Sequence, residues 1–579
     1  MRGCVFIFFA CIFTCYADSR VIETAQGPVK GYIDNGLYAF YNIPYAKAPT
    51  GRNRFKAPLP ATNRSYVLEA INKGIVCPQS IEILSMHNHT VTITEDCLIA
   101  NIFVPDTKRT SLPVIVYVHG GAFIGGHGNA LTYKQFAKTN DIIVVTFNYR
   151  LGVHGFLCMG TDDIPGNAGM KDQVALLRWV KENIANFGGD SDDVTIAGYS
   201  AGSVAVDLLM LSDMAKGLFN KVIPESGANT VAWGVQTDPM KNAKEYGKLL
   251  NFTVDDVYSL EEFYKTVSYE ILTSKQFDLF SRPDSTFLLS PCVERNTEGE
   301  EFLTDSPVNI LKSGRYNKVP ILYGFANMEG LLRTNLFEEW KNKMNEDFTE
   351  FLPPDLQFNS EEEKKIVANK IKEFYFGGNV TDENTLSYVD FFSDVLFTYS
   401  TLRAVKLHLE AGHDKIYLYE YVFVDDDVPV VLHTNVRGAT HCAQSVGVGD
   451  GNFTHADDEI FSPEAREMKK IVRELWNNFV KTGQPVPEGS NFPSWPPVGK
   501  DWSPHMELNN PLQLKGALLK ERTLFWDEIY EKHYQSRLPV STLSMEYIDE
   551  LFKILNLLYP VYLYCILYVK CMHKIIQVL

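Results

Sequence analysis

The chain has 579 residues, 45% of them hydrophobic and 22% charged, which is the composition of an ordinary globular protein with ample core. Its formal net charge of -17 argues against nucleic acid or an anionic membrane surface as the main partner. Length alone allows three or four domains. However, no repeat, low-complexity segment or linker divides residues 18–535, so we interpret them as one large domain with long insertions.

Residues 1–17 have the pattern of a secretory signal peptide. A short basic start precedes the apolar run Cys4–Tyr16, and Cys15-Tyr16-Ala17 is a small-x-small cleavage site. The run is too short for a membrane anchor, so we expect a secreted mature chain that begins near Asp18. Five glycosylation sequons agree with secretion. They are Asn63, Asn88, Asn251, Asn379 and Asn452.

An odd number of cysteines remains between the signal peptide and the C-terminal tail, which predicts at least one free thiol. Cys77 and Cys97 flank a polar segment, which favours a local, loop-closing disulfide. Cys158 lies in an apolar stretch and is expected to be buried and inert. Cys442 is expected to be unpaired.

Strand and helix patterns alternate along the chain. Arg20–Tyr32 predicts a hairpin, and Pro113–Val118 and Asp141–Phe147 are apolar, β-branched runs typical of strands covered on both faces. Asp172–Phe187 has the spacing of a buried helix face. Two later strands are predicted at Val319–Gly324 and Ile416–Phe423. This alternation predicts an α/β fold with a large, mostly parallel central sheet and helices on both faces.

The strand Pro113–Val118 leads directly into a glycine-rich loop, His119–Phe123. A glycine pair at a strand end lets successive backbone N–H groups point into one cavity, where they can hold a developing oxyanion. The alternative is that the glycines serve only the shape of the loop.

Val194–Met210 has the pattern of a buried strand, a sharp turn and a helix, with Gly198–Gly202 forming G-x-S-x-G. A serine hydroxyl is a weak nucleophile that must be lifted clear of the backbone and placed beside a base. A strand-to-helix elbow does so when the residues two before and two after the serine are small. The pentapeptide with this context predicts that Ser200 is a nucleophile.

A serine nucleophile needs an acid and a histidine, which follow it in that order in α/β-hydrolases. Glu329 lies on a loop after the Val319–Gly324 strand, although such an acid can also be a solvated loop residue. His441 lies in a small-residue loop after the Ile416–Phe423 strand. His455 competes with it but follows a sequon directly, so we favour His441 and interpret His455 as a surface histidine.

With these residues in place, the chain resembles the type-B carboxylesterase and cholinesterase family of α/β-hydrolases, and most closely its insect carboxylesterases. The resemblance runs from about Val21 to Tyr534. In the family, the catalytic histidine precedes the tryptophan of a W-x-x-F-x-K-T-G helix by about three dozen residues. His441 precedes Trp476 by 35 residues, which supports His441. The matching stretches are Arg54-Phe55, Glu95–Leu98, His119–Phe123, Asn148–Gly152, Gly166–Gly169, Phe187–Asp190, Gly198–Gly202, Glu329-Gly330, Gly438–His441 and Trp476–Gly483.

The resemblance implies a secreted serine esterase that cleaves carboxylic esters through an acyl-enzyme intermediate on Ser200. The partners are then a small-molecule ester and water, with no metal and no organic cofactor. An oxyanion hole is implied from three backbone N–H groups, those of Gly121, Ala122 and Ala201. Two alternatives remain, a slow-turnover scavenger of esters or organophosphates and a non-catalytic adhesion protein similar to neuroligins.

The resemblance also implies structural pairs and one wall of the substrate pocket. Cys77 and Cys97 would form a disulfide, and Arg54 would pair with Glu95. Trp233 matches a family position that lines the acyl pocket, although core packing is an equal alternative for this residue.

Two departures from the family pattern concern the site. The residue before the nucleophile is usually Glu, or Gln in juvenile hormone esterases, and here it is Tyr199. The acidic stretch after the histidine is replaced by Cys442–Ser445. We expect His441 to be less readily protonated and the pocket wall to differ.

Residues 536–579 form a tail outside the family domain. Its segment Ile554–Val569 is strongly apolar but contains Asn556 and Pro560, and its length is marginal for a bilayer span. A stop-transfer membrane tether with a basic inner end and a poorly ordered terminus are the two alternatives. Membrane contact is expected only in the first case.

Overall fold

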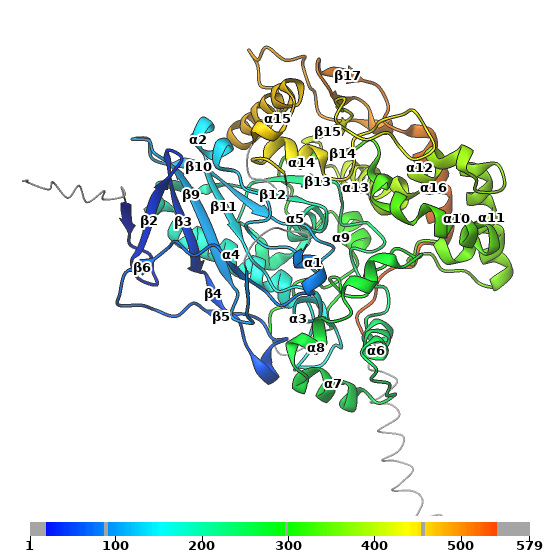
Figure 1. The fold of residues 1–579 in the computed structure, drawn as a ribbon, viewed down its shortest axis with the longest axis horizontal. Helices are drawn as coiled ribbons and strands as arrows, with labels where there is room; N and C mark the ends of the chain where they lie inside the picture. Colours follow the sequence, from blue (N-terminus) through cyan, green and yellow to red (C-terminus); the bar gives the residue numbers. More distant parts are fainter. Residues whose placement is uncertain (1–18, 86–90, 296–298, 453–457, 541–579) are drawn as a thin grey trace, which may run out of the picture.

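The computed structural model describes residues 19–85, 91–295, 299–452 and 458–540. At its centre is a 13-stranded sheet in the order β1-β2-β3-β9-β11-β10-β12-β13-β14-β15-β16-β17, with β6 beside β2 (Figure 1). The strands are β1 (Ser19–Ile22), β2 (Val29–Asp34), β3 (Leu37–Pro44), β6 (Leu68–Glu69), β9 (Ile99–Pro105), β10 (Leu112–Val118), β11 (Ile143–Phe147), β12 (Gly189–Tyr199), β13 (Lys221–Glu225), β14 (Ile321–Ala326), β15 (Ile416–Tyr421), β16 (His505–Leu508) and β17 (Gln513–Lys515).

The middle of the sheet is parallel and its edges are antiparallel. Every pairing from β11 through β10, β12, β13, β14 and β15 to β16 is parallel. The predicted hairpin forms antiparallel β1 and β2, and β16 pairs antiparallel with β17 at the other edge. The predicted mostly parallel sheet is therefore confirmed, with predicted strand ends that differ from the observed ones by a few residues.

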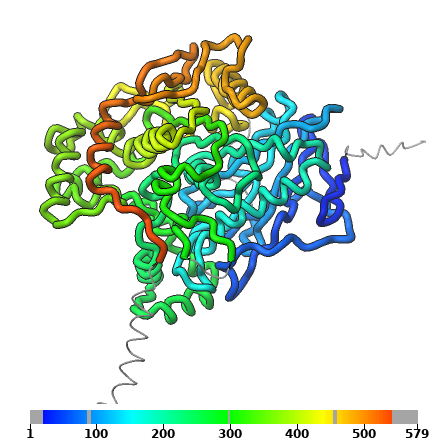
Figure 2. Tube along the Cα trace, turned by 180° about the vertical axis from the view of Figure 1, so that it is seen from behind, coloured from blue at the N-terminus to red at the C-terminus, as the bar shows by residue number. Residues whose placement is uncertain are grey.

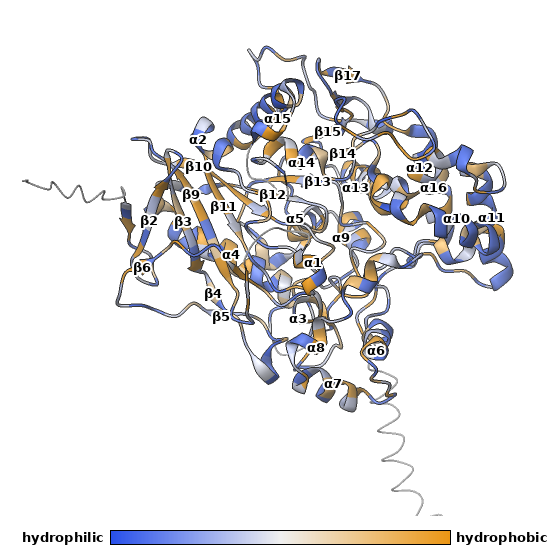
Figure 3. Ribbon diagram, in the orientation of Figure 1, coloured by the Kyte–Doolittle hydropathy of each residue, from blue (hydrophilic) through white to orange (hydrophobic). Residues whose placement is uncertain are grey.

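Side chains of the central strands alternate between two hydrophobic cores, one on each face of the sheet. On β10, Val114 and Val116 pack into the core that contains α4 (Ala168–Asn183) and α5 (Ala201–Leu211). Ile115 and Tyr117 pack into the opposite core, with α2 (Lys134–Asn140) and α15 (Pro463–Thr482). Because both faces are covered, the central strands are largely apolar, as their colouring in Figure 3 shows, apart from the polar start of β12 at Asp190–Asp193.

The helix predicted over Asp172–Phe187 begins earlier, at Ala168, and ends in a 3-10 turn over Ile184–Phe187. Long insertions after β13 and β14 carry most of the other helices, and α10, α11, α12 and α16 gather at one side of the sheet (Figure 1). These other helices are α1 (Ile81–Ser85), α3 (Gly152–Phe156), α6 (Pro239–Leu249), α7 (Val257–Thr266), α8 (Tyr269–Thr273), α9 (Pro307–Ser313), α10 (Phe337–Glu346), α11 (Glu361–Phe376), α12 (Thr385–Ser393), α13 (Tyr399–Glu410), α14 (Ala443–Val448) and α16 (Lys520–His533).

Two disulfides close loops of different length. Cys77–Cys97 is present as the resemblance implied, and Cys442 is free and buried as expected. Cys158 is not the inert free thiol that the sequence predicted, because it is bonded to Cys292, 134 residues away in the chain. The apolar stretch around Cys158 correctly indicated burial, but only tertiary packing brings the two thiols together.

The chain past Tyr534 continues over the surface of the domain, where Figure 2 shows it running from α16 towards α6. Arg537 is 1% exposed and forms an ion pair with Asp355 at 3.2 Å. Its guanidinium also donates to the carbonyl oxygens of Val231, Ala232 and Val235. Residues 536–540, which the sequence assigned to the tail, thus pack against the domain.

Several expectations fall on residues outside the described ranges, namely the signal peptide 1–17, the apolar segment of the tail, Asn88 and His455. Of the other sequon asparagines, Asn63, Asn251 and Asn379 are exposed and Asn452 is half-buried. Within the described ranges, every helix is too short or too polar to cross a bilayer.

Candidate functional site

Ser200 lies at the sharp turn between β12 and α5. Its backbone has φ 57° and ψ -124°, a strained conformation for a residue with a side chain. A β-carbon on Gly198 would lie 2.4 Å from the carbonyl oxygen of Gly202, and one on Gly202 would lie 2.1 Å from that of Val118. The turn therefore requires glycine at both positions, which is the physical basis of the G-x-S-x-G motif.

The glycine-rich loop after β10 packs directly against this turn. A β-carbon on Gly120 would lie 2.8 Å from the β-carbon of Ser200, so only glycine allows the approach. Gly121 and Ala122 both have positive φ, at 112° and 55°. Ala201 is the first residue of α5, where backbone N–H groups have no intrahelical acceptor. The three residues of the predicted oxyanion hole thus border the Ser200 turn from two elements.

Glu329 and His441 form a hydrogen-bonded pair. Glu329 begins the helical segment η5 (Glu329–Leu336) after β14, and it is fully buried rather than solvated. Its Oε2 lies 2.5 Å from Nδ1 of His441. Its Oε1 accepts hydrogen bonds from the Ser226 hydroxyl at 2.5 Å and from the Ala326 N–H at 2.8 Å. These bonds hold the carboxylate in one orientation towards the imidazole.

The imidazole of His441 stacks on an aromatic ring that sequence reasoning missed. The ring of Phe397 lies 4.1 Å from it, with 22° between the planes. Phe397 is in a π-helical segment, η8 (Asp394–Thr398), that joins α12 to α13. Such segments are frequent at functional sites because they shift the side chains that follow. The indole of Trp233 donates to the Leu396 carbonyl oxygen of the same segment at 2.9 Å.

Ser226 and Gln444 extend the network behind the Glu329–His441 pair, and sequence reasoning missed both. The Gln444 amide donates to the Ser226 hydroxyl at 2.6 Å, and this hydroxyl in turn donates to Glu329. Gln444 lies in the stretch where the chain departs from the family's acidic pattern. Its amide fixes the direction in which the Ser226 hydrogen points.

A cavity of about 560 Å³ contains Ser200 and His441 together in its lining. Gly121 and Ala122 of the glycine-rich loop border it, and Trp233 and Tyr199 are part of its wall. Most of the remaining lining is apolar, with rings from Phe277, Phe280, Phe287 and Phe397. An ester bound here would be held by apolar contacts beside the serine hydroxyl.

The two departures from the family pattern place neutral side chains beside His441. Tyr199 is 6% exposed and Cys442 is 3% exposed, and burial raises the pKa of each group above its ordinary value. Both groups are therefore protonated at neutral pH. The expected lower tendency of His441 to take up a proton stays a prediction.

Glu225 is a second buried carboxylate close to the site, at the end of β13. Its carbonyl oxygen accepts the N–H of Ser200, and its carboxylate accepts hydrogen bonds from the Trp476 indole at 2.9 Å and from the Ser445 hydroxyl. Burial raises its pKa from 4.5 to about 7. At neutral pH this group is therefore partly protonated.

We expect Glu225→Gln to stabilise the protein increasingly as the pH rises from 5 to 8. Because the pKa of Glu225 is raised in the folded state, the stability that this group contributes is fully present below pH 4.5 and is lost as the pH rises to 7. For this group the loss is at most about 3 kcal/mol, and the neutral amide does not suffer it. Thermal unfolding at both pH values, with Glu488→Gln as an exposed control, measures the difference. Parallel stability curves for Glu225→Gln and wild type would contradict it.

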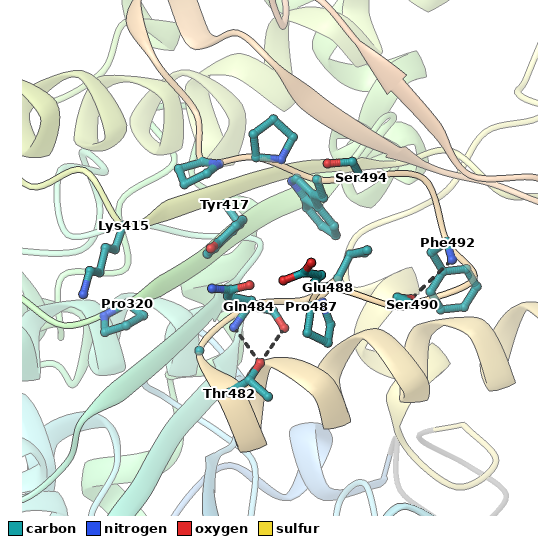
Figure 4. A pocket seen from close by; sticks show the side chains of 16 residues that line it. Pro320, Lys415, Tyr417, Thr482, Gln484, Pro487, Glu488, Ser490, Phe492 and Ser494 are labelled. Atoms are coloured by element: carbon teal, nitrogen blue, oxygen red, sulfur yellow. Dashed lines mark hydrogen bonds between the residues drawn. The ribbon is translucent and has the colours of Figure 1, made fainter.

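A second cavity, of about 700 Å³, lies at the opposite end of the parallel strands (Figure 4). Its residues Pro320, Lys415 and Tyr417 come from the amino ends of β14 and β15, whereas Ser200 and Glu329 follow carboxyl ends. Its lining contains neither histidine nor cysteine. Ligands of open parallel sheets bind at the carboxyl ends of the strands, which favours the Ser200 cavity.

Among the described residues, one group of side chains has the spacing of a metal site. Its contacts are those of a surface salt bridge. Glu338, Asp382 and His433 are exposed and lie together. The ammonium of Lys341 already bridges Glu338 at 3.0 Å and Asp382 at 2.5 Å. The cluster therefore has its own cation.

A serine elbow, a glycine-rich loop and a Glu–His pair at the carboxyl ends of a mostly parallel sheet define the serine esterases among the α/β-hydrolases. Comparison with known proteins agrees. The sequence profile of the carboxylesterase family matches residues 18–526. The chain belongs to this family and is a carboxylic ester hydrolase.

Individual relatives cover most of the chain. Juvenile hormone esterase of Heliothis virescens is 32% identical over 82% of this chain and 89% of its own length. Esterase FE4 of Myzus persicae is 32% identical over 86% of this chain and 90% of its own. Among solved structures, juvenile hormone esterase from Manduca sexta with covalently attached OTFP has a TM-score of 0.79 at 29% identity, covering 89% of this chain and 100% of its own.

Proposed function

We propose that the enzyme cleaves carboxylic esters in two covalent steps, with Ser200 as the nucleophile. The Ser200 hydroxyl attacks the ester carbonyl while His441 takes its proton, and Glu329 orients the imidazole and stabilises its charge. The backbone N–H groups of Gly121, Ala122 and Ala201 hold the oxyanion. The 2.5 Å bond between Glu329 and His441, in a cavity shared with Ser200, is the observation that supports this assignment.

His441 protonates the leaving alcohol, which completes the first step and leaves the acyl group on Ser200. In the second step His441 activates a water molecule, which hydrolyses the acyl-enzyme and releases the acid. Every role in this scheme is filled by a side chain or a backbone group of the chain itself, so the proposal includes no metal and no organic cofactor. The signal-peptide pattern of residues 1–17 and the exposed sequon asparagines support secretion.

The substrates we propose are small esters with an apolar acyl part. The aromatic lining of the cavity supports this class, because rings bury large apolar areas and leave few polar groups to pair. Two of these rings lie close to the reacting groups. Phe397 stacks on His441, and the indole of Trp233 donates to the carbonyl oxygen of Leu396, the residue before Phe397.

The experiment is a time course of 4-nitrophenyl butyrate hydrolysis, combined with peptide mapping of an organophosphonate adduct. Steady turnover with the added mass on the Ser200 peptide is the expected result. A burst of one equivalent without further turnover would instead identify a slow scavenger. If folded protein showed no hydrolysis and no adduct, that result would contradict the proposal and favour an adhesion protein on a hydrolase fold.

A further inference from the structure

Arg333 places a buried cation in the wall of the apolar Ser200 cavity. It lies on η5, four residues after Glu329, and its side chain is almost fully enclosed, with 4% of the residue exposed. Most of the cavity lining is apolar or aromatic, so a charged group is unusual there.

The contacts of Arg333 leave much of its hydrogen-bonding capacity unused. Its Nη1 donates to the carbonyl oxygen of Phe280, and its guanidinium lies 5.6 Å from the centre of the Trp340 ring. Its Nε is buried without a hydrogen-bond partner. A guanidinium offers five N–H donors, so one carbonyl oxygen does not satisfy it.

No carboxylate of the described residues forms an ion pair with Arg333. The acid whose charge reaches it, Asp284, is already bonded to Arg282 at 2.8 Å and 3.1 Å. Burial lowers the pKa of Arg333 from 12.5 to about 10, so the group is still protonated at neutral pH. A buried cation without a carboxylate partner is costly, and a hydrocarbon side chain of similar size would line the cavity without that cost.

The position of Arg333 relative to the reacting groups follows from a continuous aromatic wall. The ring of Trp233 packs edge-on against Phe287 at 5.4 Å, and Phe287 packs against Phe280 at 5.8 Å. Arg333 bonds to the backbone of Phe280. Trp233 lines the same cavity as Ser200, and its ring lies 5.9 Å from that of Phe397, which stacks on His441, so this wall leads from the reacting groups to the guanidinium.

We propose that Arg333 binds a carboxylate at the end of the acyl chain, so that the preferred substrates are half-esters of dicarboxylic acids. The apolar part of the chain would lie along the wall of Trp233, Phe287 and Phe280, and the carboxylate would pair with the guanidinium. This inference rests on the proposed function, because it concerns substrates attacked by Ser200. Hydrolysis of such a half-ester consumes one water molecule and yields an alcohol, a dicarboxylate and a proton.

The test compares two esters of equal acyl length, mono-4-nitrophenyl adipate and 4-nitrophenyl hexanoate, corrected for spontaneous hydrolysis. In the wild type, kcat/KM for the adipate half-ester should equal or exceed that for the hexanoate. In Arg333→Met the ratio of the two values should fall at least tenfold, mainly through KM. Arg178→Met removes an exposed cation from α4 and should keep the wild-type ratio.

Each outcome separates the inference from the proposed function. If the wild type hydrolysed neither ester, the result would contradict the proposed role of Ser200 itself. Turnover of hexanoate with little turnover of the half-ester, or an unchanged ratio in Arg333→Met, would show that Arg333 only packs against its neighbours and would overturn the inference. Should Arg333→Met fail to fold, Arg333→Lys keeps the charge without the planar fork, and its ratio should fall severalfold.

Discussion

Replacing Ser200 with alanine is expected to lower kcat/KM for simple esters by about 10⁵- to 10⁶-fold, the size of effect seen when a serine hydrolase loses its nucleophile. The Ser200 hydroxyl is the nucleophile of the proposed mechanism, whereas Ala201 carries no nucleophile and burial keeps the neighbouring Tyr199 phenol protonated. Residual activity would come from binding and the oxyanion hole alone. Initial rates on 4-nitrophenyl butyrate measure the loss.

The control for this variant is Ser212→Ala, at the other end of α5. Ser212 is 3% exposed, follows the last residue of α5 and is outside the cavity lining, so its loss tests only the effect of removing a nearby buried hydroxyl. Its rate should stay within about threefold of wild type. A Ser200→Ala variant that retained more than about one hundredth of the wild-type rate would rule out Ser200 as the nucleophile.

Replacing Glu329 with glutamine is expected to lower kcat by about 10³- to 10⁴-fold while the fold is kept. The carboxylate accepts three hydrogen bonds, from His441, Ser226 and Ala326. A glutamine of the same shape can present its NH₂ group to Nδ1, which favours the wrong tautomer of the imidazole and removes the charge that stabilises imidazolium. Single-turnover kinetics with unchanged thermal unfolding would assign the loss to the chemical step.

Glu225→Gln is the matched control, because Glu225 is also fully buried but bonds to Trp476 and Ser445 instead of His441. Its kcat should lie at least a hundredfold above that of Glu329→Gln. Equal losses of kcat in the two variants would mean that any buried carboxylate near the site has the same effect on the rate. That result would contradict the specific role assigned to Glu329.

The residues at the centre of the site were predictable because their signals are local. Ser200 stands in a turn that demands glycine at two fixed offsets, and the glycine-rich loop that contains Gly121 begins directly after β10. Glu329 and His441 were predictable in a weaker sense, because each follows a strand in the expected order. Their contact at 2.5 Å depends on the parallel register of β14 and β15, which no local pattern contains.

The rest of the site depends on contacts between distant segments. Phe397 stacks on His441 from a π-helical segment that is distant in the sequence, and π-helices have no clear sequence signal. The Cys158–Cys292 disulfide spans 134 residues, so the local apolar stretch indicated burial but not the partner. Arg333 was missed because a lone arginine in a helical segment gives no sign of whether it faces solvent or a cavity.

The contacts of Arg537 couple the last described residues of the chain to the shape of the active site. Its guanidinium donates to carbonyl oxygens on both sides of Trp233 in the chain. A segment far beyond Glu329 in the sequence therefore holds the part of the cavity wall that Trp233 forms. Proteolytic cleavage after Tyr534 would remove these hydrogen bonds without changing any reacting group. Arg537 therefore supports the wall of the cavity from outside the set of reacting groups.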